Sequence, residues 1–121
     1  MARLVPGLLA EPARAGEKTD HKKEEIGYVN LEVTYHCRPG QREAFYQALC
    51  DLGVRANSLQ EEGNLKYDYF FAAEAPDDLL LVESWTTPAL QQAHCQTEIF
   101  GKLQALKAEF CDSVHIDKFE S

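Results

Sequence analysis

The sequence contains no long hydrophobic run and has few basic residues for its size. A membrane-spanning helix needs about 20 consecutive, mostly apolar residues, and no stretch of these 121 residues approaches that length. Lys and Arg number 12 against 20 Asp and Glu, a formal net charge of -8, whereas nucleic-acid binding depends on clustered basic side chains. We therefore expect a soluble protein that binds neither membranes nor nucleic acid.

Motifs for metal, redox and phosphate chemistry are also missing. The four cysteines are far apart and form no C-x-x-C pair, so we expect reduced thiols rather than a zinc or redox site. His21, His36 and His115 do not have the spacing of metal ligands, and no glycine-rich loop could cradle a phosphate. Reduced thiols are typical of a cytoplasmic protein, which is what we expect. Pro6 and Gly7 interrupt the first leucines, so we expect no signal peptide.

Composition divides the chain into two parts. Residues 1–25 are rich in Pro, Gly and Ala and then in charged side chains, so we expect a flexible N-terminal arm. Residues 26–121 are expected to form one domain, because a chain of this length with 45% hydrophobic residues can bury a single core.

Hydrophobic periodicity predicts the first half of this domain. Residues 28–37 alternate apolar and polar side chains, the pattern of a half-buried strand. Residues 41–62 have apolar side chains at helical spacing and predict one long helix, in which Gly53 is a mild weakness. Gly63 then fits a left-handed cap beyond the helix.

The second half continues with a hairpin and two helical segments. Residues 65–73 and 79–85 predict paired strands around a turn. Thr87 and Pro88 suit the N-cap and first position of a helix that carries Leu90 and His94. A second helical stripe contains Ile99, Leu103, Leu106 and Phe110, and the strand-like residues 114–119 follow.

The order β-α-β-β-α-α-β is that of a ferredoxin-like, split βαβ fold of the α+β class, with a four-stranded antiparallel sheet and helices on one face. The uncovered face would carry polar side chains on the first strand but large apolar ones on its neighbours. Because such a patch is unusual on a monomer, we expect a homodimer that buries it.

Glu83, Trp85 and His94 are the candidate site residues. Glu83 and Trp85 are two apart on a strand and so share a face, and His94 follows Leu90 by one helical turn. The three could therefore meet between the sheet and the helix, where a half-buried carboxylate beside a histidine could act as an acid or base. The structural alternative is an ion-paired or capping Glu83, a core Trp85 and a hydrogen-bonded His94.

Tyr67, Tyr69 and Phe71 form an aromatic row at strand spacing. Such a row could line a pocket for a flat ligand or could serve cross-strand packing. Cys95 follows His94 directly, but neighbours on a helix point about 100° apart, so a Cys-His nucleophilic pair is not expected.

Residues 28–119 resemble the antibiotic biosynthesis monooxygenase (ABM) domain family, which includes small quinol monooxygenases. The matching pieces are Pro39-Gly40-Gln41 ahead of Phe45, the stretch EEGNLKYDY, and E-S-W followed by A-L and A-H-C-Q-T-E-I-F. The resemblance covers about three quarters of the chain. It is more specific for the fold than for the activity.

The resemblance implies a dimeric α/β barrel, in which two ferredoxin-like sheets pack face to face and each subunit has a pocket. It implies a reaction without flavin, haem or metal, in which a quinol or other phenolic substrate is deprotonated and its anion reacts with O2. On this basis His94 would be the base or orienter and Glu83 its partner. The pocket would be walled by Trp85, Tyr67, Tyr69 and Phe100.

Other members of the family suggest alternatives. Haem-degrading members have a haem-ligating histidine about ten residues beyond His94, where this chain has Gln104, so haem binding is not expected. The stretch QEEGNLKYD also resembles the enzyme that processes phosphorylated autoinducer-2, which leaves an isomerase or aldolase of a small phosphorylated keto sugar open. A non-enzymatic dimeric ligand-binding module is the third possibility.

Overall fold

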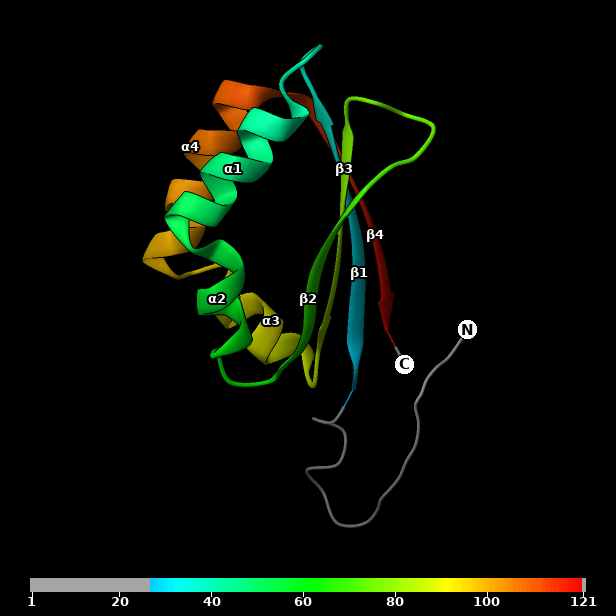
Figure 1. The fold of residues 1–121 in the computed structure, drawn as a ribbon. Helices are drawn as coiled ribbons and strands as arrows, with labels where there is room; N and C mark the ends of the chain where they lie inside the picture. Colours follow the sequence, from blue (N-terminus) through cyan, green and yellow to red (C-terminus); the bar gives the residue numbers. More distant parts are fainter. Residues whose placement is uncertain (1–26, 121) are drawn as a thin grey trace, which may run out of the picture.

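A computed structural model describes residues 27–120 and contains one sheet with four helices on one side of it (Figure 1). The strands are β1 (Val29–Cys37), β2 (Asn64–Phe71), β3 (Asp78–Trp85) and β4 (Cys111–Glu120). The helices are α1 (Arg42–Leu52), α2 (Val54–Leu59), α3 (Pro88–His94) and α4 (Glu98–Phe110). The predicted arm of residues 1–25 lies outside the described residues.

The four strands have the order β2-β3-β1-β4, and every pair is antiparallel. This arrangement confirms the predicted ferredoxin-like α+β fold. The side chains of β3 alternate, so that Leu79, Leu81, Glu83 and Trp85 are buried on the face that the helices cover. On β1, which pairs with β3, the alternate residues are buried in the same way: Val29, Leu31, Val33, Tyr35 and Cys37.

The predicted single helix of residues 41–62 is wrong in one respect, because it breaks at Gly53. This glycine has φ 82°, which places it in the left-handed region, and it both ends α1 and begins α2. Its backbone N–H donates to the Leu49 carbonyl at 3.0 Å. The physical reason is that glycine enters this conformation without steric cost, so the chain turns here and α2 is redirected toward the start of β2.

A second departure lies at the start of β2. The register between β2 and β3 shifts between Asn64 and Lys66, which leaves Leu65 outside the pairing and 57% exposed. Residues 65–71 therefore do not form one continuous apolar row. Tyr67 is 1% exposed, whereas Phe71 is 44% exposed.

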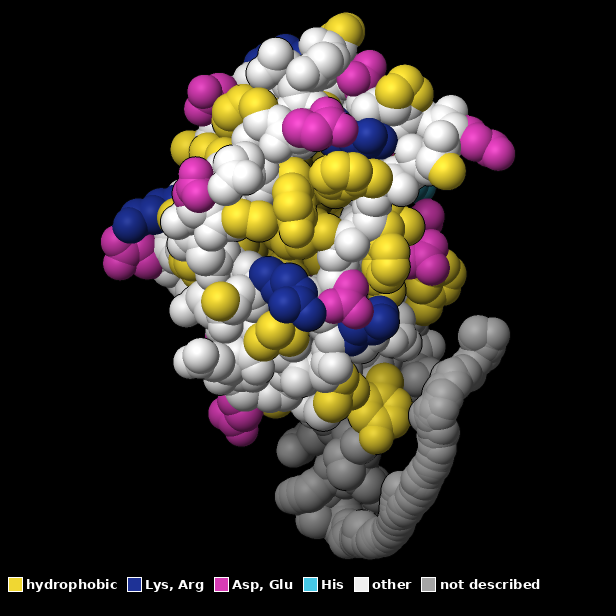
Figure 2. All heavy atoms as spheres, in the orientation of Figure 1, with side chains coloured by type: hydrophobic (Ala, Val, Ile, Leu, Met, Phe, Trp, Pro, Cys, Tyr) yellow, Lys and Arg dark blue, Asp and Glu magenta, His cyan; other side chains and the backbone are white. Residues whose placement is uncertain are grey.

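The hydrophobic core fills the space between the sheet and the helices. Phe45 and Leu49 of α1, Val54 of α2 and Leu103 of α4 pack against the buried side chains of β1 and β3. Further hydrophobic side chains gather at the surface along the seam between the helices and the sheet (Figure 2). Tyr46 of α1 is partly buried against the core, and its ring centroid lies 5.8 Å from that of Tyr69 and 5.3 Å from that of Phe71.

The other face of the sheet carries no helix among the described residues (Figure 1). The register places Phe70, Leu80 and Phe119 on this face, and Phe70 and Phe119 are 46% and 52% exposed. Within residues 27–120, no helix is both long and apolar enough to cross a membrane.

Candidate functional site

Glu83, Trp85 and His94 meet between the sheet and α3, as their spacing predicts. Thr87 caps α3 by accepting a hydrogen bond from the Leu90 backbone N–H at 3.1 Å, and the helix then ends at His94. The exposed fractions of Glu83, Trp85 and His94 are 5%, 0% and 3%. The Trp85 and His94 ring centroids lie 4.7 Å apart, so the indole and imidazole are in contact.

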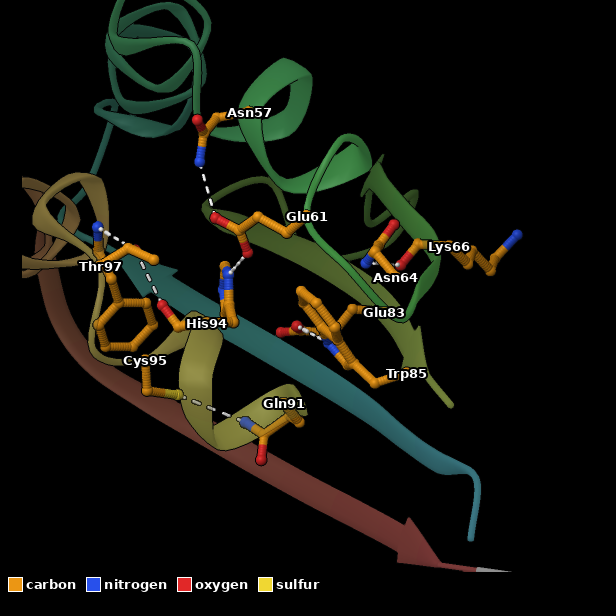
Figure 3. A network of polar contacts seen from close by, with 11 residues as sticks. Asn57, Glu61, Asn64, Lys66, Glu83, Trp85, Gln91, His94, Cys95 and Thr97 are labelled. Carbon is orange, nitrogen blue, oxygen red and sulfur yellow. Dashed lines mark hydrogen bonds and ion pairs between the residues drawn. The ribbon is translucent and has the colours of Figure 1, made fainter. Parts of the chain in front are cut away.

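The hydrogen bonds of the site differ from the expected pairing of His94 with Glu83. Oε1 of Glu83 accepts a hydrogen bond from Nε1 of Trp85 at 2.8 Å. Nδ1 of His94 lies 2.6 Å from Oε1 of Glu61, and Oε2 of Glu61 accepts from Nδ2 of Asn57 at 2.7 Å (Figure 3). The carboxylate partner of His94 is therefore Glu61, which belongs to the turn between α2 and β2.

Sequence reasoning missed Glu61 because it interpreted this turn only as the end of a helix. Glu61 is 33 positions from His94, and no periodicity links a turn to a helix end at that separation. The only available signal was that Glu61 lies within EEGNLKYDY, one of the stretches that resemble the ABM family. That signal does not distinguish Glu61 from Glu62.

The two carboxyl groups near His94, those of Glu83 and Glu61, lie in different environments. Burial raises the pKa of Glu83, and the hydrogen bond from Trp85 and the charge of His94 only partly offset this effect. Glu61 is less enclosed, with 18% of its side chain exposed against 2% for His94. Glu83 is therefore a buried carboxyl that favours its protonated form more than usual, while Glu61 keeps contact with solvent.

Aromatic side chains surround the imidazole of His94. Its ring centroid lies 5.8 Å from that of Tyr67 and 5.3 Å from that of Phe100. Tyr69 is one step further out, with its ring centroid 5.9 Å from Tyr67. Burial raises the pKa of both Tyr67 and Tyr69, so these side chains remain neutral phenols. Of the predicted wall residues, Trp85, Tyr67 and Phe100 contact His94 directly.

The hydroxyl groups of Ser58, Tyr67 and Tyr69 lie together on the side of the sheet that the helices cover. The Ser58 side-chain oxygen is fully buried and the Tyr69 hydroxyl oxygen is enclosed. The Tyr67 hydroxyl between them is the group with which each can share a hydrogen bond.

Glu61 also lines an open cavity of about 490 Å³. The cavity is lined by Leu52, Asn57, Glu61, Thr97, Glu98, Ile99 and Lys102. Glu61 thus contacts both this cavity and the buried His94.

The remaining candidates do not join the site. Sγ of Cys95 accepts a hydrogen bond from Nε2 of Gln91 at 3.4 Å and makes none to His94. Phe71 lies at the surface, where Cζ of the Arg42 guanidinium is 4.4 Å from the centroid of the Phe71 ring. Within residues 27–120, no group of three or more His, Cys, Asp or Glu side chains could hold a metal ion.

Comparisons with known proteins agree with this architecture. The sequence profile of the family described as antibiotic biosynthesis monooxygenase matches residues 29–106, whereas no curated protein matches the chain.

Solved structures show the same fold in bacterial proteins. A Pseudomonas aeruginosa protein is 26% identical with a TM-score of 0.71, covering 80% of this chain and 96% of its own. A Bacteroides thetaiotaomicron protein of unknown function, described as a possible oxidoreductase, is 27% identical with a TM-score of 0.71 and coverages of 79% and 99%. A Nitrosomonas europaea protein named as a candidate antibiotic biosynthesis monooxygenase is 22% identical with a TM-score of 0.67 and coverages of 80% and 89%. Because the family profile matches well over half of the sequence, the chain belongs to the antibiotic biosynthesis monooxygenase family.

Proposed function

We propose that this protein is a cofactor-independent monooxygenase that oxidises a quinol or related phenolic aromatic with O2, and that it acts as a cytoplasmic homodimer. The observation that carries the proposal is the state of His94. Its Nδ1 is held by Glu61, its Nε2 makes no hydrogen bond to any described residue, and three aromatic rings surround it. A buried imidazole with one nitrogen held and the other free is suited to act as a general base.

The proposed reaction begins when Nε2 of His94 accepts the proton of a substrate hydroxyl group. The resulting phenolate is electron-rich and reacts with O2. One oxygen atom enters the ring and the other leaves as water, and the quinol itself supplies the electrons as it becomes a hydroxylated quinone. The reaction therefore needs no external reductant.

The other site residues have proposed roles that follow from their environments. Trp85, Tyr67 and Phe100 would stack against a flat substrate, with Tyr69 further out. Glu83 remains a proposed catalytic group, because a carboxyl with a raised pKa can hold a proton closer to neutral pH than an exposed one.

The phosphorylated keto sugar alternative finds less support. A phosphate site needs Arg or Lys side chains that are free to bind it. The cavity beside Glu61 has two carboxylates and one ammonium group in its lining, and Nζ of that Lys102 lies 3.6 Å from Oε2 of Glu98. This balance of charge favours a neutral substrate over a dianionic one.

Oxygen consumption by metal-free protein with a panel of quinols tests the proposal. We expect turnover by the wild type and a loss of roughly 10²-fold or more in His94→Ala. Gln47→Ala is the control, because Gln47 is exposed on α1, outside both the site and the uncovered sheet face, and its change should leave turnover unaltered. Absence of turnover on every quinol, or equal loss in both variants, would overturn the proposal.

The proposed homodimer has a separate test. The uncovered sheet face presents Phe70 and Phe119, which a partner sheet would bury. Light scattering at micromolar concentration should give twice the monomer mass of 13.6 kDa. A monomer under these conditions would contradict it.

A further inference from the structure

We infer that Glu61 is the positioning residue of His94: it fixes the imidazole in the tautomer with the proton on Nδ1 and leaves Nε2 as the acceptor. The catalytic meaning of this inference rests on the proposed function, but the tautomer itself does not.

The first step is the chemistry of the contact. An ionised carboxylate can only accept hydrogen bonds, so the 2.6 Å contact between Oε1 of Glu61 and Nδ1 of His94 places the proton on Nδ1. In a neutral imidazole the other nitrogen then has a lone pair. Nε2 of His94 makes no hydrogen bond to residues 27–120, and therefore nothing described competes for that lone pair.

The second step is the rigidity of Glu61. Its Oε2 accepts from Asn57 Nδ2 at 2.7 Å, so both carboxylate oxygens are held. Its backbone N–H donates to the Ser58 carbonyl at 3.1 Å, and its own carbonyl accepts from the Asn64 N–H at 3.2 Å. A carboxylate fixed in this way selects one orientation of the ring that it binds.

The third step compares the burial and the hydrogen-bond partners of Glu61 and Glu83, the two carboxyl groups near His94. The ionisable groups that face His94 are Glu61 from the turn after α2, Glu83 from β3 and Tyr67 from β2; α4 contributes the uncharged Phe100. Glu83 is almost fully buried and already bonded to Trp85. Glu61 alone of these three lines the open cavity. Glu61 is therefore the carboxyl group that contacts His94 directly, whereas Glu83 is engaged by Trp85.

The simpler alternative is that Glu61 only ties the α2–β2 turn to α3. Both roles predict a loss of stability when Glu61 is changed. Only the positioning role predicts a change of tautomer, so the tautomer is the decisive measurement.

The experiment uses the full-length protein labelled with 15N-histidine and compares Glu61→Gln with Glu62→Gln. Glu62 is the exposed neighbour of Glu61, so its variant makes the same chemical change outside the site. In wild type and Glu62→Gln, the 15N shifts of His94 should show a protonated Nδ1 and a bare Nε2. A glutamine amide can both donate and accept, so the two shifts should move toward each other in Glu61→Gln. In turnover assays kcat should fall at least about tenfold while KM changes less than about twofold.

Asn57→Ala provides a second variant should Glu61→Gln fail to fold. It keeps the carboxylate but frees Oε2, so a partial shift of the two His94 nitrogens toward each other is expected. A protonated Nε2 in the wild type, or unchanged His94 shifts in Glu61→Gln and in Asn57→Ala, would overturn the inference. If no quinol is turned over but the tautomer responds as expected, the positioning role stands and the proposed function falls.

Discussion

Nδ1 of His94 and Oε1 of Glu61 lie 2.6 Å apart, although 33 positions of the chain separate the two residues. The contact joins the end of α3 to the turn that follows α2. A second link between the same segments is the backbone hydrogen bond from the Thr86 N–H to the Gly63 carbonyl, at 2.8 Å. The geometry of the site therefore depends on how closely this turn approaches α3.

Gly63→Ala should disturb that approach. Gly63 has φ 84°, and a Cβ added to it would lie 2.5 Å from Leu90 Cδ1 and 2.9 Å from Thr86 Oγ1. Left-handed strain and the collision with α3 together should cost about 2–4 kcal/mol of unfolding free energy. Urea denaturation measures this cost, and activity should fall as well because α3 carries His94.

Alanine substitutions at two other glycines distinguish the backbone strain at Gly63 from its collision with α3. Gly53 has φ 82° but open space where a Cβ would lie, so Gly53→Ala should cost only the backbone strain, about 1–2 kcal/mol. Gly101 lies within α4 with open space and no positive φ, so Gly101→Ala should stabilise by about 0.5–1 kcal/mol. If Gly63→Ala lowers the unfolding free energy no more than Gly53→Ala does, the collision with Leu90 contributes nothing to that loss.

The fold could be predicted from the sequence because periodicity reports which face of an element is buried. The alternation in β1 and β3 and the Thr87-Pro88 start of α3 are local signals, and the structure confirms each of them. The break at Gly53 was underestimated, because a glycine within a helical pattern is tolerated as often as it ends the helix. The bulge at Leu65 depends on pairing with β3, which local sequence does not specify.

The site was predictable only in part, for a related reason. Glu83 and Trp85 share a strand, so their common face follows from spacing, and the helix phase brings His94 toward them. The choice between Glu83 and Glu61 as the partner of His94 depends on the path of a turn in three dimensions. The indole N–H of Trp85 already donates a hydrogen bond to Glu83, and His94 is bound by Glu61 instead.

Trp85→Phe tests how strongly that indole N–H holds Glu83. Phenylalanine removes the donor and part of the ring volume, so the buried carboxyl loses its hydrogen bond beside a small void. We expect a loss of about 2–4 kcal/mol in unfolding free energy, measured by urea denaturation. In a Glu83→Met background the same change should cost about 1–3 kcal/mol less, because no carboxyl is left unpaired. Equal costs in both backgrounds would show that the hydrogen bond contributes nothing.

The raised pKa of Glu83 predicts how stability depends on pH. Between its ordinary value near 4.5 and its raised value in the folded protein, Glu83 binds a proton more readily in the folded state than in the unfolded state. Its contribution to the unfolding free energy therefore falls as pH increases through this window. Glu83→Gln cannot ionise and can still accept the Trp85 hydrogen bond, so its stability relative to wild type should increase from about pH 4.5 upward. Denaturation curves at several pH values measure the difference, with Glu62→Gln as the exposed control. A difference that does not change with pH would mean that burial does not disfavour the charged form of Glu83.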